Sequence, residues 1–441
     1  MLKLGYSETD ITPKKPVQLI GFSRDDNTSC GVLKPLIAQA AVWENEEKCC
    51  LVTIDSIGFT TELADLLRDR IGRVLGIPRE KVMLCFSHTH AAPDADTDRE
   101  YYDLLCDRAE ESVSRAAAQM KPVSAGWTNA SAVIGVNRRK ASDMTDDRIG
   151  ILKLCSRQTE KPELLILRVT AHGNVLKRDN RMVSPDYFGD VRETAAAKFH
   201  CPVMVIQGAA GNTAPKYFCS GETPVDAATD QFIRSDNALA DMARVITESV
   251  ETKFNIIPLR DSCPIRMFSR QILLASDVPS VENASRIAAE AKASCGIADT
   301  GWLDKVTRLN AEGIREQAEN VEMQFFSIGD WCLCGGPYEF MVGFALESEK
   351  LLEDEFFYLN GYTNGCLLYF PTEDEYDLGG YEVFWSMLIY YRYIDRVFPF
   401  RREEASRLIR FVTECIKEGR KEDNYDATKG KKGNKNTPLA K

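Results

Sequence analysis

Three histidines are the residues of this sequence best suited to chemistry. His88 and His90 stand two apart, directly after the apolar run Val82–Phe86, and His172 ends another apolar run, 164–171. The whole chain has only four histidines, which favours a function over a pair of surface residues beyond a buried strand. His88 and His90 stand at the end of a predicted strand, so its period of two directs both imidazoles to one face. Two such histidines can divide one task, because one can hold a metal while the other moves protons.

The elements around these histidines predict an α/β protein with mixed sheets flanked by helices. Strands are expected at 3–8, 37–43, 50–55 and 203–207, with a hairpin turn at 44–47 and a second hairpin from 149–155 and 164–171. An amphipathic helix over 63–75 ends at Gly76, and further helices are expected at 98–120 and 187–200. Asp55 and His88 then both follow strands, where α/β proteins gather their site residues.

The second half of the chain predicts further helices and strands within the same domain. Helices are expected at 230–250, 281–294, 300–320, 384–395 and 402–417, and another is expected to begin at Pro337. Strands are expected at 265–274, in a hairpin of 322–328 with 331–334, and in a pair around Asn360 and Gly361. Residues 421–441 are rich in Lys, Gly and Asn and are expected to form a disordered tail after one catalytic domain, 1–420.

The composition excludes several classes of protein. A formal net charge of -11 argues against a nucleic-acid partner held by phosphate contacts. No window reaches the roughly 18 uninterrupted apolar residues of a membrane span, and the first residues contain no apolar signal region. The fourteen cysteines include no Cys-x-x-Cys pair and lie largely in apolar runs. These features are typical of a reduced, cytoplasmic protein.

The loop 208–215, which follows the strand 203–207, is built from small residues that let the backbone approach a ligand closely. It lacks the Lys of a phosphate-binding loop and opens no clear helix, so nucleotide binding is not expected.

Seven short motifs occur in one order along the chain. They are Asp10-Ile11-Thr12-Pro13, Ser87-His88-Thr89-His90-Ala91-Ala92-Pro93, Asn137-Arg138, Ala171-His172-Gly173, Gln207-Gly208-Ala209-Ala210-Gly211-Asn212, Gly336-Pro337-Tyr338-Glu339-Phe340 and Tyr369-Phe370-Pro371-Thr372. Together they resemble the catalytic domain of the neutral/alkaline (non-lysosomal) ceramidase family, from about residue 4 to about residue 383. Each motif alone is weak, whereas seven in order are specific.

The resemblance implies a zinc-dependent amidase. It makes His88, His172 and Glu339 zinc ligands and Tyr369 a fourth, with Pro371 standing where the family usually has Thr. The local match at Tyr369 is short, and Tyr362 and Tyr376 are near it in the sequence. The family also uses an Arg and a Tyr at its site. The serine that the family carries in the loop after the strand 203–207 is Ala214 here, which excludes a mechanism through that serine.

Elementary chemistry makes the same set plausible. Two neutral imidazoles and a carboxylate are common ligands of catalytic zinc, which lowers the pKa of a bound water to about 7. His90 is then the expected general base, and Arg138 and Tyr381 are the candidates to stabilise an oxyanion. Asp55 and Asp186 are either partners that orient the ligand histidines or surface caps.

The sequence therefore predicts a zinc hydrolase of a carboxylic amide. A zinc hydrolase of an ester or non-lipid amide, or a catalytically silent homologue that binds a metal or ligand, remain alternatives. The family's secreted members carry a signal sequence and an immunoglobulin-like C-terminal domain, and neither is found here. The segments 94–96 and 373–375, which are expected near the site, are acidic. We expect a pocket smaller and more polar than a ceramidase's, suited to a soluble small-molecule amide with a short acyl group.

Overall fold

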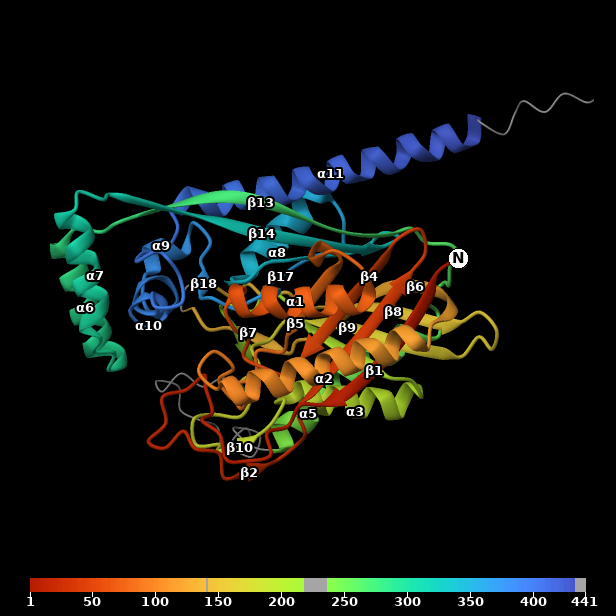
Figure 1. Cartoon of the computed structure of the whole chain (residues 1–441), viewed down its shortest axis with the longest axis horizontal. Coiled ribbons are helices and arrows are strands. Elements are labelled where there is room, and N and C mark those ends of the chain that lie inside the picture. The colour runs from red at the N-terminus through yellow and green to blue at the C-terminus, as the bar shows by residue number, and fades with distance from the viewer. Residues whose placement is uncertain (140–141, 218–235, 433–441) are drawn as a thin grey trace, which may run out of the picture.

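The computed structural model of the protein describes residues 1–139, 142–217 and 236–432. Two β-sheets pack face to face, and helices cover the outer face of each sheet. Figure 1 shows α11 running along β13 and β14 on one side of the molecule, with α2, α3 and α5 on the other. The predicted α/β class, with mixed sheets flanked by helices, is confirmed.

The larger sheet has the strand order β11-β9-β8-β6-β1-β3-β4-β5. Its strands are β1 (Lys3–Asp10), β3 (Ile37–Glu44), β4 (Lys48–Ile54), β5 (Val82–Phe86), β6 (Lys121–Ser131), β8 (Arg148–Ser156), β9 (Pro162–Val169) and β11 (Val203–Gln207). Strands β4 and β5 are parallel, as are β9 and β11, and the other neighbours are antiparallel. The two hairpins predicted within this sheet, β3–β4 and β8–β9, are therefore confirmed.

Alternation along the strands creates the two faces of this sheet. In β3, Ala40 and Val42 belong to the core beneath the helices, whereas Ala41 and Trp43 belong to the core between the two sheets. The covering helices are α1 (Thr61–Leu75), α2 (Arg99–Ala118), α3 (Tyr187–Phe199) and α5 (Asp236–Phe254). Both faces of the sheet are thus buried, which explains the nearly continuous apolar runs in the sequence.

The smaller sheet has the order β13-β14-β15-β17. Its strands are β13 (Ile265–Asp277), β14 (Glu316–Ile328), β15 (Trp331–Gly335) and β17 (Phe357–Asn360). Its outer face packs on α8 (Val342–Leu352) and α11 (Arg402–Lys432). The helices α6 (Val281–Cys295) and α7 (Thr300–Ala311) connect β13 to β14 and lie together at one end of this long hairpin (Figure 1).

Short elements complete the described chain. Three two-stranded sheets pair β2 (Gly31–Val32) with β10 (Met182–Val183), β7 (Gly135–Asn137) with β12 (Thr213–Pro215), and β16 (Glu339–Phe340) with β18 (Tyr369–Phe370). The single-turn helices are η1 (Arg79–Lys81), α9 (Glu375–Leu378), the π-helix η2 (Tyr381–Trp385) and α10 (Met387–Tyr390).

The parallel strand pairs determine where the site lies. The chain leaves the carboxyl ends of β5, β9 and β11 into the segments that carry His88, His172 and the loop 208–215. The edges of the larger sheet also approach each other, since β11 lies near β4 and β5. In the smaller sheet, Glu339 follows β15, and Tyr362 follows the parallel strand β17. These strand ends meet at one place, as expected for α/β proteins.

Four element predictions are wrong in the second half of the chain. The helix expected over 300–320 ends at Ala311, because Gly313 adopts a positive φ of 76° and β14 begins at Glu316 to pair with β13. Pro337 opens no helix, and α8 begins only at Val342. The strands around Asn360 do not pair with each other, because β17 joins β15 and β18 joins β16. The helix expected over 384–395 is replaced by η2, α10 and a series of turns.

The predicted boundary of the catalytic domain stays a prediction. Helix α11 continues to Lys432, into the segment predicted as a disordered tail, and residues 433–441 lie outside the described residues. The first residues of the helix expected over 230–250 also lie outside them, and α5 is described from Asp236.

Candidate metal centre

The three histidines singled out in the sequence converge in the folded chain. His88, His90 and His172 are all buried, and each offers a ring nitrogen that lies within 4.8 Å of the other two. The Nε2 atoms of His90 and His172 are 3.1 Å apart. Within the described residues these three histidines are therefore arranged closely enough to hold a metal ion.

The prediction that His88 and His90 lie on one face of a strand is wrong. Strand β5 ends at Phe86, and His88 has a positive φ of 58°, so the two histidines lie in a turn rather than on one face of a strand. Their rings nevertheless approach edge to face, with centroids 5.0 Å apart. The turn is held by the backbone, where His90 N donates to Gly173 O beside His172. A left-handed residue at a non-glycine position is strained, and such strain is common at functional sites.

Backbone carbonyls fix the orientation of two of the imidazoles. His88 Nδ1 lies 2.7 Å from Ile57 O, and His172 Nδ1 lies 3.2 Å from Ala210 O. A carbonyl oxygen only accepts hydrogen bonds, so each Nδ1 carries the proton and each Nε2 presents a lone pair. Both lone pairs are then available to a metal ion. Carbonyl groups behind metal-binding histidines commonly play this orienting role.

Glu339 faces these two lone pairs. Its Oε2 lies 3.3 Å from His88 Nε2 and 3.7 Å from His172 Nε2. The residue is 2% exposed, and this oxygen has no hydrogen-bond partner in the described structure. A buried carboxylate oxygen beside two nitrogen acceptors is costly unless a cation sits among them. The donor set of two imidazoles and a carboxylate therefore fits zinc.

Tyr369 lies beside Glu339 because of strand pairing. The parallel strands β16 and β18 place Glu339 opposite Tyr369 in register, so both side chains leave the same face. Burial raises the pKa of the Tyr369 phenol, and Glu339 raises it further. The Tyr369 hydroxyl lies 3.1 Å from Arg138 Nη2, and Tyr376 is directed elsewhere, donating to Phe400 O.

Tyr362 is a neighbour of the centre that the sequence left as an alternative. Its ring centroid is 4.4 Å from that of His88, and its buried hydroxyl has no hydrogen-bond partner in the described structure. Its φ of 54° is positive, and its carbonyl accepts from Phe86 N at the end of β5. Pairing between the two sheets is therefore what brings Tyr362 onto His88.

Arg138 and Tyr381 are brought to the same centre. Arg138 donates to the hydroxyl of Tyr369 and to the carbonyl of Gly211, and forms an ion pair with Glu382 at 3.0 Å. Tyr381 packs edge to face on Tyr369, with centroids 5.8 Å apart. Burial raises the pKa of Tyr381 to about 12, so its hydroxyl stays a proton donor at neutral pH.

The position of Tyr381 depends on an ionic network behind it. Arg139 donates to Glu375 and to Glu382, the residue after Tyr381. Glu382 thus receives both Arg138 and Arg139 and holds the π-helix η2 against the site. Single π-helical turns occur frequently at functional sites.

His90 is enclosed by the loop that carries Phe22. The Phe22 ring lies 4.8 Å from the His90 ring, and Arg24 Nη2 donates to His90 O at 2.7 Å. Gly21 has a φ of 98°, and a Cβ there would lie 2.6 Å from His90 Nδ1, so only glycine fits. Burial lowers the pKa of both His90 and His172 well below the usual range of histidine. His90 is therefore neutral at pH 7, as both a general base and a metal ligand must be.

Asp55 and Asp186 do not orient the histidine rings. Asp55 forms a buried ion pair with Arg192, at 2.6 and 2.8 Å. Asp186 caps α3 and accepts the N–H groups of Val175 and Leu176, which follow His172. Neither predicted alternative is correct as stated: Asp186 is a helix cap, but a buried one rather than one at the surface, and Asp55 is a buried ion-pair partner.

The small-residue loop 208–215 is a support for the centre. Ala210 O orients His172, and Gly211 N donates to Phe340 O beside Glu339. A Cβ at Gly211 would lie 2.4 Å from Glu339 O, so this contact requires glycine. Asn212 also binds, through its side chain, Val342 N and Glu375.

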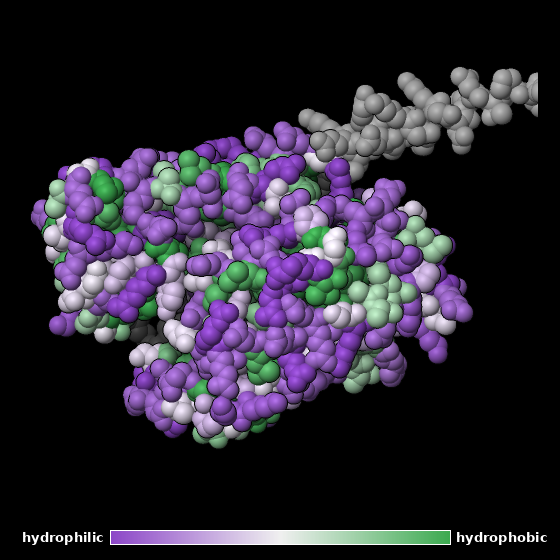
Figure 2. All heavy atoms as spheres, in the orientation of Figure 1, coloured by the Kyte–Doolittle hydropathy of each residue, from purple (hydrophilic) through white to green (hydrophobic). Residues whose placement is uncertain are grey.

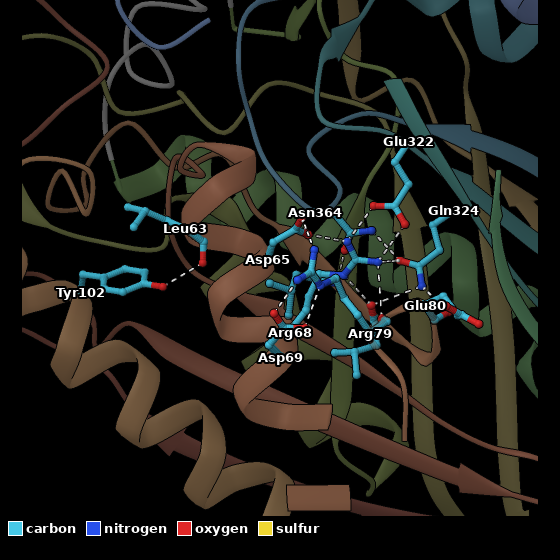
Figure 3. Close-up of polar contacts among 12 residues, drawn as sticks. Leu63, Asp65, Arg68, Asp69, Arg79, Glu80, Tyr102, Glu322, Gln324 and Asn364 are labelled. Carbon is cyan, nitrogen blue, oxygen red and sulfur yellow. Dashed lines mark hydrogen bonds and ion pairs between the residues drawn. The ribbon is translucent and has the colours of Figure 1, made fainter. Parts of the chain in front are cut away.

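A buried polar network fixes the strand that leads to His88 (Figure 3). Arg68 of α1 is fully buried and binds Asp65, both carboxylate oxygens of Glu322 on β14, and the carbonyl of Val82. Asn364 uses its side-chain oxygen to accept Leu84 N in the middle of β5 and its amide to reach Gln324. Strand β5 is an edge strand, so these contacts replace a missing neighbour and tie it to the smaller sheet.

A cavity of about 510 Å³ opens onto the metal centre. His88, His90, Arg138, Glu339, Tyr369 and Tyr381 line it, so it joins all the predicted site residues except the more deeply placed His172. Most of its remaining wall is apolar, with Ile20 and Phe22, Ile57, Leu367, Ile389 and, from the loop after α6, Ile297. Asp94 and Asp96 also line it. The expected polar pocket is thus found only in part, because acidic groups are present but apolar groups dominate.

Several residues around the centre carry no local signal in the sequence. Ile57 and Ala210 act through their carbonyl groups, which any residue provides. Cys366 approaches His88 Nδ1 at 3.6 Å from a loop nearly three hundred residues away along the chain. Only Gly21, next to an aromatic residue within a polar loop, carries a feature that could have directed attention to a close backbone approach.

The surface facing the viewer in Figure 2 is mainly hydrophilic, with hydrophobic side chains in small groups among the polar ones. Among the described residues, the helices include none with the length and apolar character needed to cross a bilayer.

The same fold occurs in solved ceramidase structures. The neutral ceramidase from Pseudomonas aeruginosa matches with a TM-score of 0.67 and 16% sequence identity over 92% of this chain and 75% of that one. A structure described as ceramidase complexed with C2 matches with a TM-score of 0.66 and 17% identity over 86% of this chain and 71% of that one. No family model matches the sequence, and no curated protein is similar to it at a significant level. The comparison confirms the predicted ceramidase-like fold.

Proposed function

We propose that this protein is a zinc-dependent hydrolase that cleaves a carboxylic amide. The observation that carries the proposal is the Glu339 carboxylate, buried without a hydrogen bond at Oε2 and facing the Nε2 lone pairs of His88 and His172. We assign His88, His172 and Glu339 as zinc ligands and Tyr369 as the fourth. The ceramidase-like fold supports the choice of an amide as substrate.

The residues around the centre suit hydrolysis of a carbonyl compound. Bound zinc lowers the pKa of a coordinated water to about 7 and polarises the carbonyl that is attacked. His90 is neutral and lines the cavity, so it can take a proton during attack and return it to the leaving amine. Arg138 and the Tyr381 hydroxyl, which line the same cavity, donate hydrogen bonds to the oxyanion that develops on the carbonyl oxygen.

The expected substrate is a small amide with a short acyl group. A volume of about 510 Å³ lies within the range of pockets that hold drug-sized ligands, and its apolar wall suits a hydrocarbon portion of limited length. Each methylene that is buried adds about 0.8 kcal/mol of transfer free energy. The rate should therefore rise with acyl length only until the cavity is filled.

Two measurements test the proposal. Metal analysis of purified protein should find about one zinc per chain, and a chelator should abolish amide hydrolysis that added zinc restores. Amides of one amine with acyl groups from about two to about sixteen carbons should then show a rate maximum at short or medium length, since each step adds the same transfer term. A rate that climbs steadily to the longest chain would instead favour ceramide, and faster cleavage of the matched esters would favour the esterase alternative.

A further inference from the structure

The loop that encloses His90 contains an arginine that the proposed reaction does not use. Arg24 is partly buried, and its guanidinium donates to the backbone carbonyl groups of His90 at 2.7 Å, Asn180 at 3.0 Å and Ile20 at 3.5 Å. Hydrogen bonds from a charged donor are shorter and stronger than those from a neutral one. Arg24 therefore ties its own loop firmly to the His90 turn and to the segment that follows His172.

The hydrogen bond from Arg24 complements one on the other side of the same residue. His90 N donates to Gly173 O, and His90 O accepts from Arg24, so both peptide groups of His90 are held. The loop is also held close by, because Ile20 N donates to Ala92 O. With its backbone held on both sides, His90 has a fixed direction in which its side chain leaves the chain.

The ring of His90 is oriented differently from the other two imidazoles of the centre. His88 and His172 each turn Nδ1 towards a backbone carbonyl. His90 Nδ1 is buried without a well-aligned hydrogen bond, and the backbone of Gly21 lies against it. The Phe22 ring packs on the imidazole at a centroid distance of 4.8 Å.

The remaining contact of the His90 ring is with a proposed metal ligand. Its Nε2 lies 3.1 Å from His172 Nε2. An imidazole nitrogen has a single lone pair, so His172 Nε2 accepts no hydrogen bond once it holds zinc. In the zinc-bound protein the orientation of the His90 ring therefore depends on its packing against this loop.

We propose that the loop 20–24 positions the His90 imidazole for proton transfer, and that Arg24 and Phe22 are its positioning residues. Arg24 acts on the backbone of His90, and Phe22 acts on its ring. The inference rests on the proposed function for the role of His90 as a general base, whereas the positioning itself can be observed without turnover. A misplacement of about 1 Å can slow a reaction about 10²-fold. Loosening this loop should therefore slow hydrolysis while zinc stays bound.

NMR of the histidine rings tests the positioning directly. The chain has four histidines, so full-length protein with zinc and carbon-13 at the imidazole Cε1 should give four resonances. That of His90 is identified by its loss in His90→Ala. Arg24→Gln removes a side chain that binds the His90 carbonyl rather than its ring, so a shift or broadening of this resonance reports a displaced or mobile ring. The resonances of His88 and His172 should stay in place, because their carbonyl partners are unchanged.

Arg181→Gln is the matched control. Arg181 binds the chain just after the loop, through Thr28 O at 3.0 Å and an ion pair with Asp26 at 2.5 Å, and neither contact involves His90. This variant should leave the His90 resonance and the rate of hydrolysis unchanged. A His90 resonance that is the same in the unaltered protein and in Arg24→Gln overturns the proposal.

Hydrolysis of one amide measures the consequence for the reaction. Arg24→Gln should lower kcat about 10- to 100-fold, with KM and zinc content within about twofold of those of the unaltered protein. In the His90→Ala background the same substitution should cost nothing further, because its effect passes through His90. An equal loss in both backgrounds overturns the proposal, and so does a loss of zinc from folded Arg24→Gln. If Arg24→Gln does not fold, Phe22→Leu, which keeps every hydrogen bond of Arg24, carries the same tests of the resonance and kcat.

These measurements separate the inference from the proposed function. A protein whose His90 resonance responds to Arg24→Gln but which cleaves no amide would contradict only the proposed function. An amide hydrolase in which Arg24→Gln changes neither the His90 resonance nor kcat would contradict only the positioning role of the loop.

Discussion

Replacing Glu339 by glutamine should change the stability of the protein in opposite directions with and without zinc. In the metal-free protein, Glu339 Oε2 is buried, has no hydrogen bond and faces the lone pairs of two imidazoles. Leaving a buried polar group unsatisfied costs about 1–3 kcal/mol. In the Glu339→Gln variant an N–H group can donate to His88 Nε2, so the metal-free variant should be more stable by about that amount.

Zinc should reverse this order. A ligand that binds only the folded state at about a thousandfold excess over its Kd stabilises the protein by about 4.1 kcal/mol. The variant lacks the carboxylate ligand and should gain little. The stabilisation of the unaltered protein by zinc exceeds the stability difference that favours the variant without metal. In excess zinc the unaltered protein should therefore be the more stable of the two, by about 1–3 kcal/mol.

Urea denaturation in a chelator and in excess zinc measures both differences. Glu322→Gln is the matched control, because Glu322 faces the buried guanidinium of Arg68 rather than the metal centre (Figure 3). Because Asp65 still pairs with Arg68, this substitution should cost only about 1–3 kcal/mol, and equally with and without zinc. If Glu339→Gln were destabilising to the same extent under both conditions, the carboxylate would not face a metal ion, and the assignment of the centre would fail.

Three further outcomes are expected. His172→Ala should reduce the zinc content far below one per chain, because it removes one of the three strongest proposed ligands; an undiminished content would remove His172 from the ligand set and point to the neighbouring His90 nitrogen instead. His90→Ala should retain zinc and lose about 10²–10⁴-fold in hydrolysis, the usual worth of a general base, whereas a metal-free variant would make His90 a ligand. Although burial opposes it, Arg168 and Arg148 lower the pKa of Asp146. A depressed carboxyl pKa stabilises the folded state above the unfolded value of about 3.9 and less as the pH falls through the folded value. Asp146→Asn should therefore destabilise the protein at pH 7, by a margin that shrinks below about pH 4 in denaturation curves.

Local pattern was sufficient for the elements that build the first half of the fold. Strands β5 and β11 occupy the predicted residues, and α1, α2 and α3 lie where helices were predicted. The apolar residues of these segments recur with a local pattern, so whether each segment forms a helix or a strand follows from short-range sequence alone. The scarcity of histidine likewise selected the three residues that converge.

The sequence by itself determined the α/β class, most strands and helices, and the residue types of the centre. Only the tertiary structure decided how they meet. The turn at His88, the placement of Tyr362 on its ring, and the register of Glu339 with Tyr369 all depend on contacts between segments far apart in the chain. The π-helix that presents Tyr381 depends in the same way on Arg138 and Arg139. Strand pairs and ion pairs between distant segments have no local pattern in the sequence, because these segments come into contact only when the sheets and loops pack together.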